Sequence, residues 1–217
     1  MTDPARIATP LLAVATALLV ALLAPLALFN PWFVSLLQQR AESAMLLGAT
    51  QAQVDAATGT ILAHLWLGGD FVVRLTPDGP PLLDAFERSH MVDVSGLVRV
   101  LAIITVVAAV VAIVSARMLR GRPTAIGGAL LAGAGIVGVA GIVVAVVFAV
   151  AFDAAFLAFH ELFFRQGTYL FGPGSNLIRL FPEQFWYEAS LTAGIFIVAS
   201  ALAVSVAGWR LVRRRTT

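Results

Sequence analysis

Apolar residues occur in four long runs along the chain, and polar residues gather between them. The runs are Ile7–Phe29, Leu97–Ala116, Ala125–Phe152 and Ala189–Trp209. A helix needs about 20 predominantly apolar residues to cross a hydrocarbon core about 30 Å thick, and each run is long enough. The pattern therefore predicts an all-α polytopic membrane protein with four transmembrane helices. We expect residues 1–217 to form a single integral membrane domain.

The composition supports this class. Hydrophobic residues make up 60% of the chain, charged residues only 12%, and the mean hydropathy is +0.94. Soluble globular domains carry about 25% charged residues, so this chain lies outside their range. The first run could instead be a cleaved signal peptide, but it is longer than the usual apolar core of about 7–15 residues. A retained first helix is the favoured interpretation.

The arginines indicate the orientation of the helices. Arg117, Arg120 and Arg122 lie between the second and third runs, and further arginines follow the fourth run at 210 and 213–215. Short cytoplasmic segments carry an excess of basic residues, so both termini are predicted to be cytoplasmic. The segments 30–95 and 153–188 are then extracytoplasmic. The pI near 9.9 reflects this topology and contact with membrane lipid, and we expect no nucleic-acid partner.

The first extracytoplasmic segment is expected to be mainly helical. Mixed helical patterning over Val34–Leu47 and Gln51–Leu67 predicts two helices on or near the membrane surface. A short extended piece, Phe71–Leu75, leads into the strong turn signal Thr76–Pro81. A new helix should begin at about Asp84, a good N-cap residue, and continue into the second span.

Small residues are frequent in the third run. The pairs Ala129/Gly133 and Ala134/Gly138 have the small-xxx-small spacing that lets two membrane helices approach closely. Packing within the chain is the favoured reading, and a homodimer interface is the alternative. The sequence contains no cysteine, which excludes disulfides, thiolate nucleophiles and cysteine-ligated metals.

His90 lies in the polar segment just before the second run. In a helix, Glu87, His90 and Asp93 fall on one face, so that carboxylates would flank the imidazole. Imidazole has an unperturbed pKa near 6.5 and exchanges protons near neutral pH. A carboxylate partner would orient the ring and fix its tautomer, as general base catalysis requires.

His160 follows the third run. A helical extension of that run would place Asp153, Phe156, His160 and Phe164 roughly on one face, with the histidine among aromatic residues. This histidine and His90 stand at the same predicted depth, each beside a span, so they could converge on one site. The alternative is that each is an ordinary interfacial side chain that reaches towards the lipid headgroups.

Other polar residues carry weaker signals. His64 lacks such a setting and is expected to be structural or on the surface. A metal site built from His90, His160 and a carboxylate is conceivable, but the spacing of metal-binding helices is missing, and no metal or cofactor is expected. Arg165 and Arg179 could contact lipid headgroups, although ordinary interfacial arginines are the simpler reading.

Taken together, the motifs show a family resemblance. They are His90-Met91-x-Asp93-Val94, Phe159-His160-x-x-Phe163-Phe164 and Leu177-Ile178-x-x-Phe181-Pro182-Glu183-x-Phe185. In this order relative to the four spans, they resemble the four-helix bacterial membrane family that includes the lipoprotein intramolecular transacylases, called Lit. The layout is similar over nearly the whole chain. This chain departs from the family pattern at Tyr169 and Asn176, where members often have Trp and Asp, and in its glycine-rich third span.

The resemblance implies a membrane acyltransferase. Its substrates would be lipoproteins whose N-terminal cysteine carries a diacylglyceryl group, and the sn-2 acyl chain would move to the α-amine of that cysteine to give a lyso-form lipoprotein. His90 and His160 would be the catalytic residues. The resemblance also implies supporting and substrate-binding side chains around them. The supporting residues would be Glu87, Asp93 and Glu161, and the substrate contacts Met91, Phe159, Phe163, Phe164 and Arg165.

Two other classes compete with this function. A non-catalytic sensor or partner-binding subunit would explain the apolar content but not the two placed histidines. A transporter is disfavoured because the spans carry almost no charged residue to line a substrate path. A shared catalytic centre requires the two imidazoles to lie within about 10 Å of each other.

Overall fold

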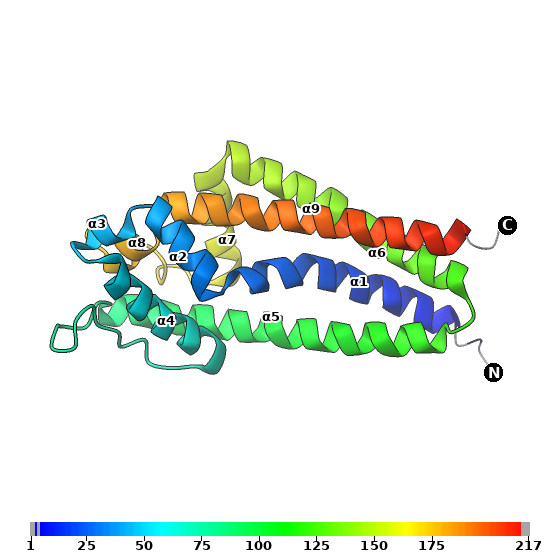
Figure 1. The fold of residues 1–217 in the computed structure, drawn as a ribbon, viewed down its shortest axis with the longest axis horizontal. Helices are drawn as coiled ribbons and strands as arrows, with labels where there is room; N and C mark the ends of the chain where they lie inside the picture. Colours follow the sequence, from blue (N-terminus) through cyan, green and yellow to red (C-terminus); the bar gives the residue numbers. More distant parts are fainter. Residues whose placement is uncertain (1–2, 4, 214–217) are drawn as a thin grey trace. The chain divides into compact units, whose positions relative to one another are not determined.

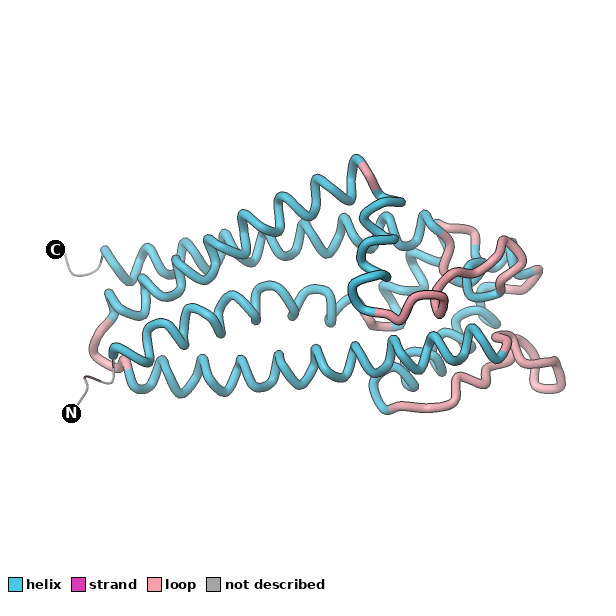
Figure 2. Tube along the Cα trace, turned by 180° about the vertical axis from the view of Figure 1, so that it is seen from behind, coloured by secondary structure: helices cyan, strands magenta, loops and turns pink. Residues whose placement is uncertain are grey.

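The computed structural model describes residues 3 and 5–213, and all regular structure in these residues is helical (Figures 1 and 2). In chain order, the helices are α1 (Ala5–Leu28), α2 (Pro31–Arg40), α3 (Ser43–Leu47), α4 (Gln51–Leu67), α5 (Ala85–Met118), α6 (Pro123–Val150), α7 (Phe152–Phe163), α8 (Asn176–Leu180) and α9 (Glu183–Arg213). The predicted all-α class is confirmed.

Four of these helices, α1, α5, α6 and α9, are long and apolar enough to cross a membrane. They correspond to the four predicted apolar runs, although α1 ends at Leu28 and α6 at Val150, before the predicted ends Phe29 and Phe152. Helix α5 begins where the sequence indicates, because Asp84 and Glu87 form a reciprocal cap. The backbone N–H of Glu87 donates to Asp84 Oδ1 at 2.8 Å, and the N–H of Asp84 donates to Glu87 Oε2 at 2.8 Å.

The described chain divides into two compact units. Among the described residues, the bundle unit comprises residues 3, 5–26, 101–146 and 192–213 and is formed by segments of α1, α5, α6 and α9. The site unit comprises residues 27–100 and 147–191 and contains α2, α3, α4, α7 and α8 with the first turns of α5 and α9.

Close contact between helices builds the bundle unit. A Cβ added at Gly133 of α6 would overlap the backbone carbonyl oxygen of Ala13 in α1. A Cβ at Gly127 would lie 2.5 Å from the carbonyl oxygen of Gly208 in α9, so these two helices also touch through their backbones. Ala134 is fully buried in the same interface. The small residues of the third apolar run therefore serve packing within the chain.

The site unit has a larger apolar core, and a buried polar network ties its helices together. Gln38 of α2 donates to Thr58 Oγ1 of α4 at 3.0 Å and to the carbonyl oxygen of Leu180 in α8 at 3.1 Å. Ser43 of α3 donates to the same carbonyl at 3.0 Å, and Figure 1 shows α3 and α8 next to each other. The core residues include Val34, Leu37, Val54, Ile61, Leu65, Phe71, Leu83, Met91, Leu177, Leu180 and Phe185. This network holds α8, and with it the loop that precedes it, in place.

The prediction of a single helix over Val34–Leu47 is wrong in one respect, because the segment is divided between α2 and α3. Glu42 stands between the two helices in the left-handed region, with φ 56° and ψ 30°. This bend turns the Ser43 hydroxyl inward to its buried partner. The next helix, α4, has the predicted bounds Gln51–Leu67 and a Thr50 cap.

The extended piece predicted at Phe71–Leu75 lies in an irregular loop, residues 68–84, and is contradicted at its first residue (Figure 2). Phe71 adopts a left-handed φ of 55° and is fully buried. Its backbone N–H donates to His64 Nδ1 at 3.2 Å, and the two rings meet edge to face at 5.3 Å. His64 is therefore structural, as the sequence indicates.

The expected helical extension of the third span is interrupted at Ala151, which has φ −142° and ψ 50°. Helix α7 starts afresh at Phe152. The ring of Phe152 stacks on Phe156 at 5.4 Å and meets Tyr187 of α9 edge to face at 5.6 Å. These contacts hold α7 in a direction different from that of the last turn of α6, which an uninterrupted helix could not adopt.

Candidate active site

Two short helical segments of the site unit bring the histidines together. His90 stands in the second turn of α5, just after the Asp84–Glu87 cap, and His160 stands in the last turn of α7. Their rings stack with centroids 5.9 Å apart and an interplanar angle of 24°. The predicted convergence of the two imidazoles is confirmed.

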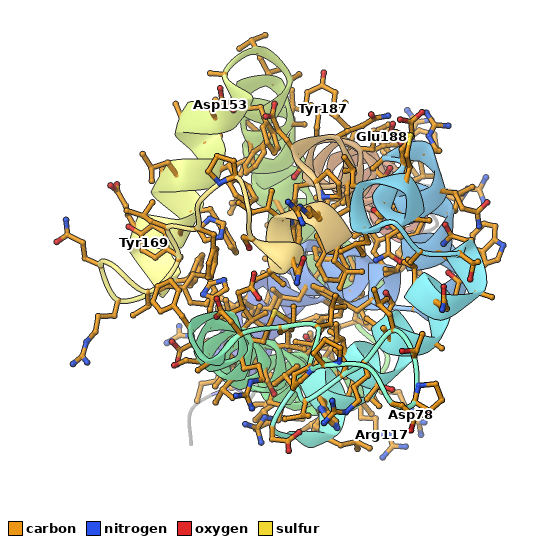
Figure 3. The ribbon with its side chains drawn as sticks, turned by 90° about the vertical axis from the view of Figure 1, so that its left-hand side faces the viewer. Asp78, Arg117, Asp153, Tyr169, Tyr187 and Glu188 are labelled. Carbon is orange, nitrogen blue, oxygen red and sulfur yellow. The ribbon has the colours of Figure 1, made fainter. Side chains whose placement is uncertain are left out.

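Aromatic rings enclose this pair. Phe164, which ends α7, lies 4.9 Å from the ring of His90 and 5.5 Å from that of His160. Phe171 packs on His90 at 5.4 Å, and Tyr169 packs on His160 at 5.3 Å. Both come from the loop between α7 and α8, and Figure 3 shows Tyr169 on it, at the opposite end of α7 from Asp153. The enclosure limits the access of water to the imidazoles.

The hydrogen bond of His160 determines its tautomer. Its Nδ1 lies 2.7 Å from the backbone carbonyl oxygen of Phe156, one helical turn earlier. Because a carbonyl oxygen only accepts, Nδ1 must carry the proton, and in the neutral ring Nε2 keeps its lone pair. Burial lowers the pKa of His160 below its ordinary value, and the bond to Phe156 opposes this shift. His160 is thus a neutral base at neutral pH.

His90 has a different environment. It lies before the charge-free stretch 100–116 of α5, is only 6% exposed, and its Nδ1 has no hydrogen-bond partner among the described residues. Burial first, and then the neighbouring His160, lower the pKa of His90 to about 4, although the carboxylate of Asp93 acts in the opposite direction. His90 is therefore a neutral imidazole at any pH above about 5.

The sequence predicts that Glu87 orients the imidazole of His90, but its carboxylate bonds to other groups instead. Its side chain is 2% exposed and joins α5 to the start of α8. Oε1 accepts from the Ser175 hydroxyl and, at 3.0 Å, from the backbone N–H of Leu177, while Oε2 accepts from Asp84. The Glu87 carboxylate is occupied by donors from Ser175, Leu177 and Asp84. It therefore influences His90 only by fixing the backbone of α5 and of the segment that begins α8.

The other two expected supporting residues lie at the surface. Asp93 is exposed on α5 and influences His90 through its charge alone. Glu161 is exposed on α7, next to His160 in the chain. Among the residues that the structure describes, no three His, Cys, Asp or Glu side chains gather as a metal ion would require.

The five expected substrate contacts fall into two groups. Phe164 touches both imidazoles, whereas Met91 is 6% exposed and belongs to the core of the site unit. Phe159 and Phe163 are 40% and 45% exposed and meet in a tilted ring contact along α7, and Arg165 is exposed just after it. Met91 is therefore a core residue, Phe164 belongs to the enclosure of the histidines, and Phe159, Phe163 and Arg165 are at the surface.

Sequence reasoning missed Phe171 and Ser175. Ser175 caps α8, with its hydroxyl accepting from the N–H of Ile178 at 3.3 Å, and a serine before a short apolar helix is a recognisable cap signal. Nothing in the local pattern marks Phe171, because its position against His90 depends on how the loop folds back. Asn176, noted as a departure from the family, donates to the carbonyl oxygen of Leu82 at 2.7 Å, which an aspartate could not do.

Comparison with known proteins agrees with this geometry. The model of the family "Lipoprotein intramolecular transacylase Lit" matches residues 11–186, most of the chain. This chain belongs to the Lit family. No curated protein matches its sequence.

Solved structures of a Lit protein share the fold. Lit from Bacillus cereus is 20% identical, with a TM-score of 0.86 over 98% of this chain and 97% of that one. Two variants of that protein, in which one histidine is replaced by arginine or by alanine, give a TM-score of 0.78 at 19% identity. They cover 98% of this chain and 93% and 95% of their own. With four apolar helices, the chain is an integral membrane protein of the Lit family.

Proposed function

We propose that this protein moves the sn-2 acyl chain of a diacylglyceryl lipoprotein to the α-amine of its own N-terminal cysteine. The observation that supports this function best is the pair of stacked imidazoles in an aromatic enclosure, with a fixed tautomer at His160. Such a pair can transfer protons at an ester without a metal. The activity in the family's name is an acyl transfer on lipoproteins, and this site suits that chemistry.

His160 acts as the base of the reaction. The α-amine of the cysteine attacks the carbonyl carbon of the sn-2 ester, forming a C–N bond, and its surplus proton passes to Nε2 of His160. The bond from that carbon to the glyceryl oxygen then breaks, and the imidazolium of His160 returns the proton to this oxygen. The products are an amide and a free sn-2 hydroxyl, so the lipoprotein keeps its mass. General acid–base catalysis of this kind contributes about 10²–10⁴-fold.

His90 supports the negative oxygen of the tetrahedral intermediate. As a neutral imidazole it carries one N–H, which can donate to that oxygen without a competing charge. Proximity contributes a further large factor, because amine and ester belong to one molecule and the enzyme mainly has to fold the substrate back on itself. The aromatic enclosure keeps water from attacking in place of the amine.

The acyl chains lie against α7. The outer side of this helix exposes Leu157, Phe159, Leu162 and Phe163, an apolar surface suited to hydrocarbon. Arg165 stands at the end of the same surface, where a headgroup or the glyceryl ester would be. With the arginines of the α5–α6 connection on the cytoplasmic side, the site faces the extracytoplasmic side of a bacterial membrane.

Mass spectrometry of a reporter lipoprotein tests this function. The protein is expressed in a host that lacks N-acylating enzymes, and the N-terminal lipopeptide is fragmented. We expect an isomer of unchanged mass with an acylated α-amine, and none with His160→Ala. A lipopeptide that has lost one acyl chain would instead indicate a lipase. An unchanged free amine, with the protein present in the membrane, would favour a non-catalytic member of the family.

A further inference from the structure

A cavity of about 450 Å³ in the site unit is lined in part by Phe171, which also packs on His90 of the histidine pair. It is formed by the segment that leads into α5 and by the end of the α7–α8 loop. The residues that matter for its chemistry are Asp84, Phe86, Glu87, Phe171, Ser175 and Asn176. We call this cavity the polar cleft.

Hydrogen bonds across its base hold the two walls of the polar cleft together. Glu87 on the α5 side accepts from Ser175 and Leu177 on the α8 side. Asn176 on the α8 side donates to the carbonyl oxygen of Leu82 at 2.7 Å on the other. These bonds join residues about 90 positions apart in the chain, so the cleft is preformed before any ligand arrives.

One aromatic ring separates the polar cleft from the reacting groups. The ring of Phe171 packs on that of His90, with centroids 5.4 Å apart, and on that of Phe86, another residue of the cleft, with centroids 5.1 Å apart. A molecule in the polar cleft therefore lies within one side chain of His90.

The polar cleft and the surface of α7 differ in chemistry. The cleft is lined by carboxylates, a hydroxyl, an amide and the backbone of Gly172 and Gly174, whereas the exposed side chains of α7 around His160 are large and apolar apart from Glu161. A diacylated N-terminus also has two chemistries, with acyl chains on one side of the reacting ester and amine and a hydrated peptide on the other. A peptide backbone needs hydrogen-bonding partners that hydrocarbon cannot supply.

We propose that the polar cleft receives the peptide residues that follow the lipidated cysteine, and that its charge disfavours acidic residues there. This inference rests on the proposed function and adds the part of the substrate that is not lipid. The ionisable groups that line the cleft, Asp84 and Glu87, are both acidic. Arg88 is half-buried and donates its guanidinium N–H at Nε to the backbone carbonyl oxygen of Asp84 at 3.3 Å. The Glu87 carboxylate is buried and engaged by three donors, so an incoming aspartate would chiefly meet the like charge of the exposed Asp84, whereas serine or lysine would not.

Photo-crosslinking locates the peptide directly. A diacylated lipopeptide with a benzophenone amino acid at its third position is bound to the His160→Ala variant, which cannot turn it over, in liposomes. We expect the label in segments 81–87 and 170–176, as read by peptide mapping. Labelling confined to α7, or labelling of the cleft by a benzophenone on the acyl chain instead, would overturn the assignment.

Kinetics test the charge preference. Three lipopeptides that carry Ser-Ser, Lys-Lys or Asp-Asp after the cysteine are compared by kcat/KM. We expect the Asp-Asp peptide to react about three- to tenfold more slowly than Ser-Ser with the natural protein. Asp84→Asn, which keeps the helix cap, should bring this ratio to within about twofold. Asp153→Asn, which changes the charge equally at the far end of α7, should leave the ratio as it is.

The two proposals fail in different ways. Transfer on all three peptides at equal rates, or crosslinks outside the polar cleft, would remove the peptide assignment and leave the acyl transfer standing. Crosslinks in the cleft without N-acylation of any peptide would remove the transfer and leave the peptide site standing.

Discussion

The bundle unit and the site unit are held together in different ways. In the bundle unit, α1, α6 and α9 touch through glycine and alanine, and the hydroxyls of Thr16 and Thr105 bond to carbonyls of their own helices at 2.7 and 2.8 Å. In the site unit, Gln38 and Glu87 bond to segments more than 85 residues away in the chain. The bundle unit needs only helices whose backbones approach closely, whereas the site unit needs specific polar partners.

The difference follows from what surrounds each unit. Between helices in lipid, apolar burial gives little driving force, and close van der Waals packing at small residues replaces it. The site unit has irregular loops whose backbone groups need partners, and its buried carboxylate and amide supply them. We therefore expect changes in the bundle unit to alter stability, and changes in the site unit to alter chemistry first.

The largest effect is expected from the histidines. His90→Ala and His160→Ala should each reduce N-acylation of the reporter by about 10³-fold or more while the protein stays in the membrane fraction. His64→Ala, which removes the acceptor for the Phe71 N–H, should instead lower the thermal stability and spare the turnover of folded molecules. Full activity of either site variant would exclude that histidine from the mechanism.

Glycines of α6 test the bundle unit. Gly133→Ala forces a Cβ against the carbonyl oxygen of Ala13 and should cost about 1–3 kcal/mol of stability. Gly135→Ala on the same helix meets nothing within 4 Å and should be neutral or stabilising by about 0.5–1 kcal/mol. Thermal unfolding in detergent measures both. Equal melting temperatures for the two variants would contradict the close contact between α1 and α6.

The pH dependence tests the base. Transfer needs a neutral α-amine, with a pKa near 8, and a neutral His160, whose pKa is lowered. As the pH falls from about 8, the rate should drop tenfold per unit with no second break at 6.5. It should steepen to about a hundredfold per unit only below the lowered pKa of His160. Initial rates in liposomes from pH 5 to 9 measure this, and a second break at or above 6.5 would contradict the buried, neutral base.

The smallest effects are expected from the carboxylates near His90. Glu87→Gln replaces an acceptor of three hydrogen bonds by a group with one acceptor oxygen, and should weaken transfer about five- to fiftyfold without abolishing it. Asp93→Asn, at the surface, should weaken it less than about threefold. Initial rates and melting temperatures are measured together. If both variants react as fast as the natural protein, these carboxylates serve only as a helix cap and as surface charge.

Much of the fold was predictable because it depends on neighbours in the chain. The four apolar runs, the start of α5 at the Asp84–Glu87 cap and the bounds of α4 all follow from periodicity and capping residues. The prediction failed at Glu42 and Ala151, where helices break without a glycine or proline signal. Both breaks are stabilised by distant contacts, of Ser43 with Leu180 and of Phe152 with Tyr187.

For the site, the sequence by itself determined which groups can do the chemistry: two histidines beside membrane helices, without thiols, in motifs of the Lit family. Only the tertiary structure decided how they differ. The bond to Phe156 fixes the tautomer of His160, burial beside Phe164 and Phe171 keeps His90 neutral, and Glu87 holds a loop rather than an imidazole. The reason is physical, because protonation and tautomer depend on burial and hydrogen-bond partners, which folding brings from distant parts of the chain.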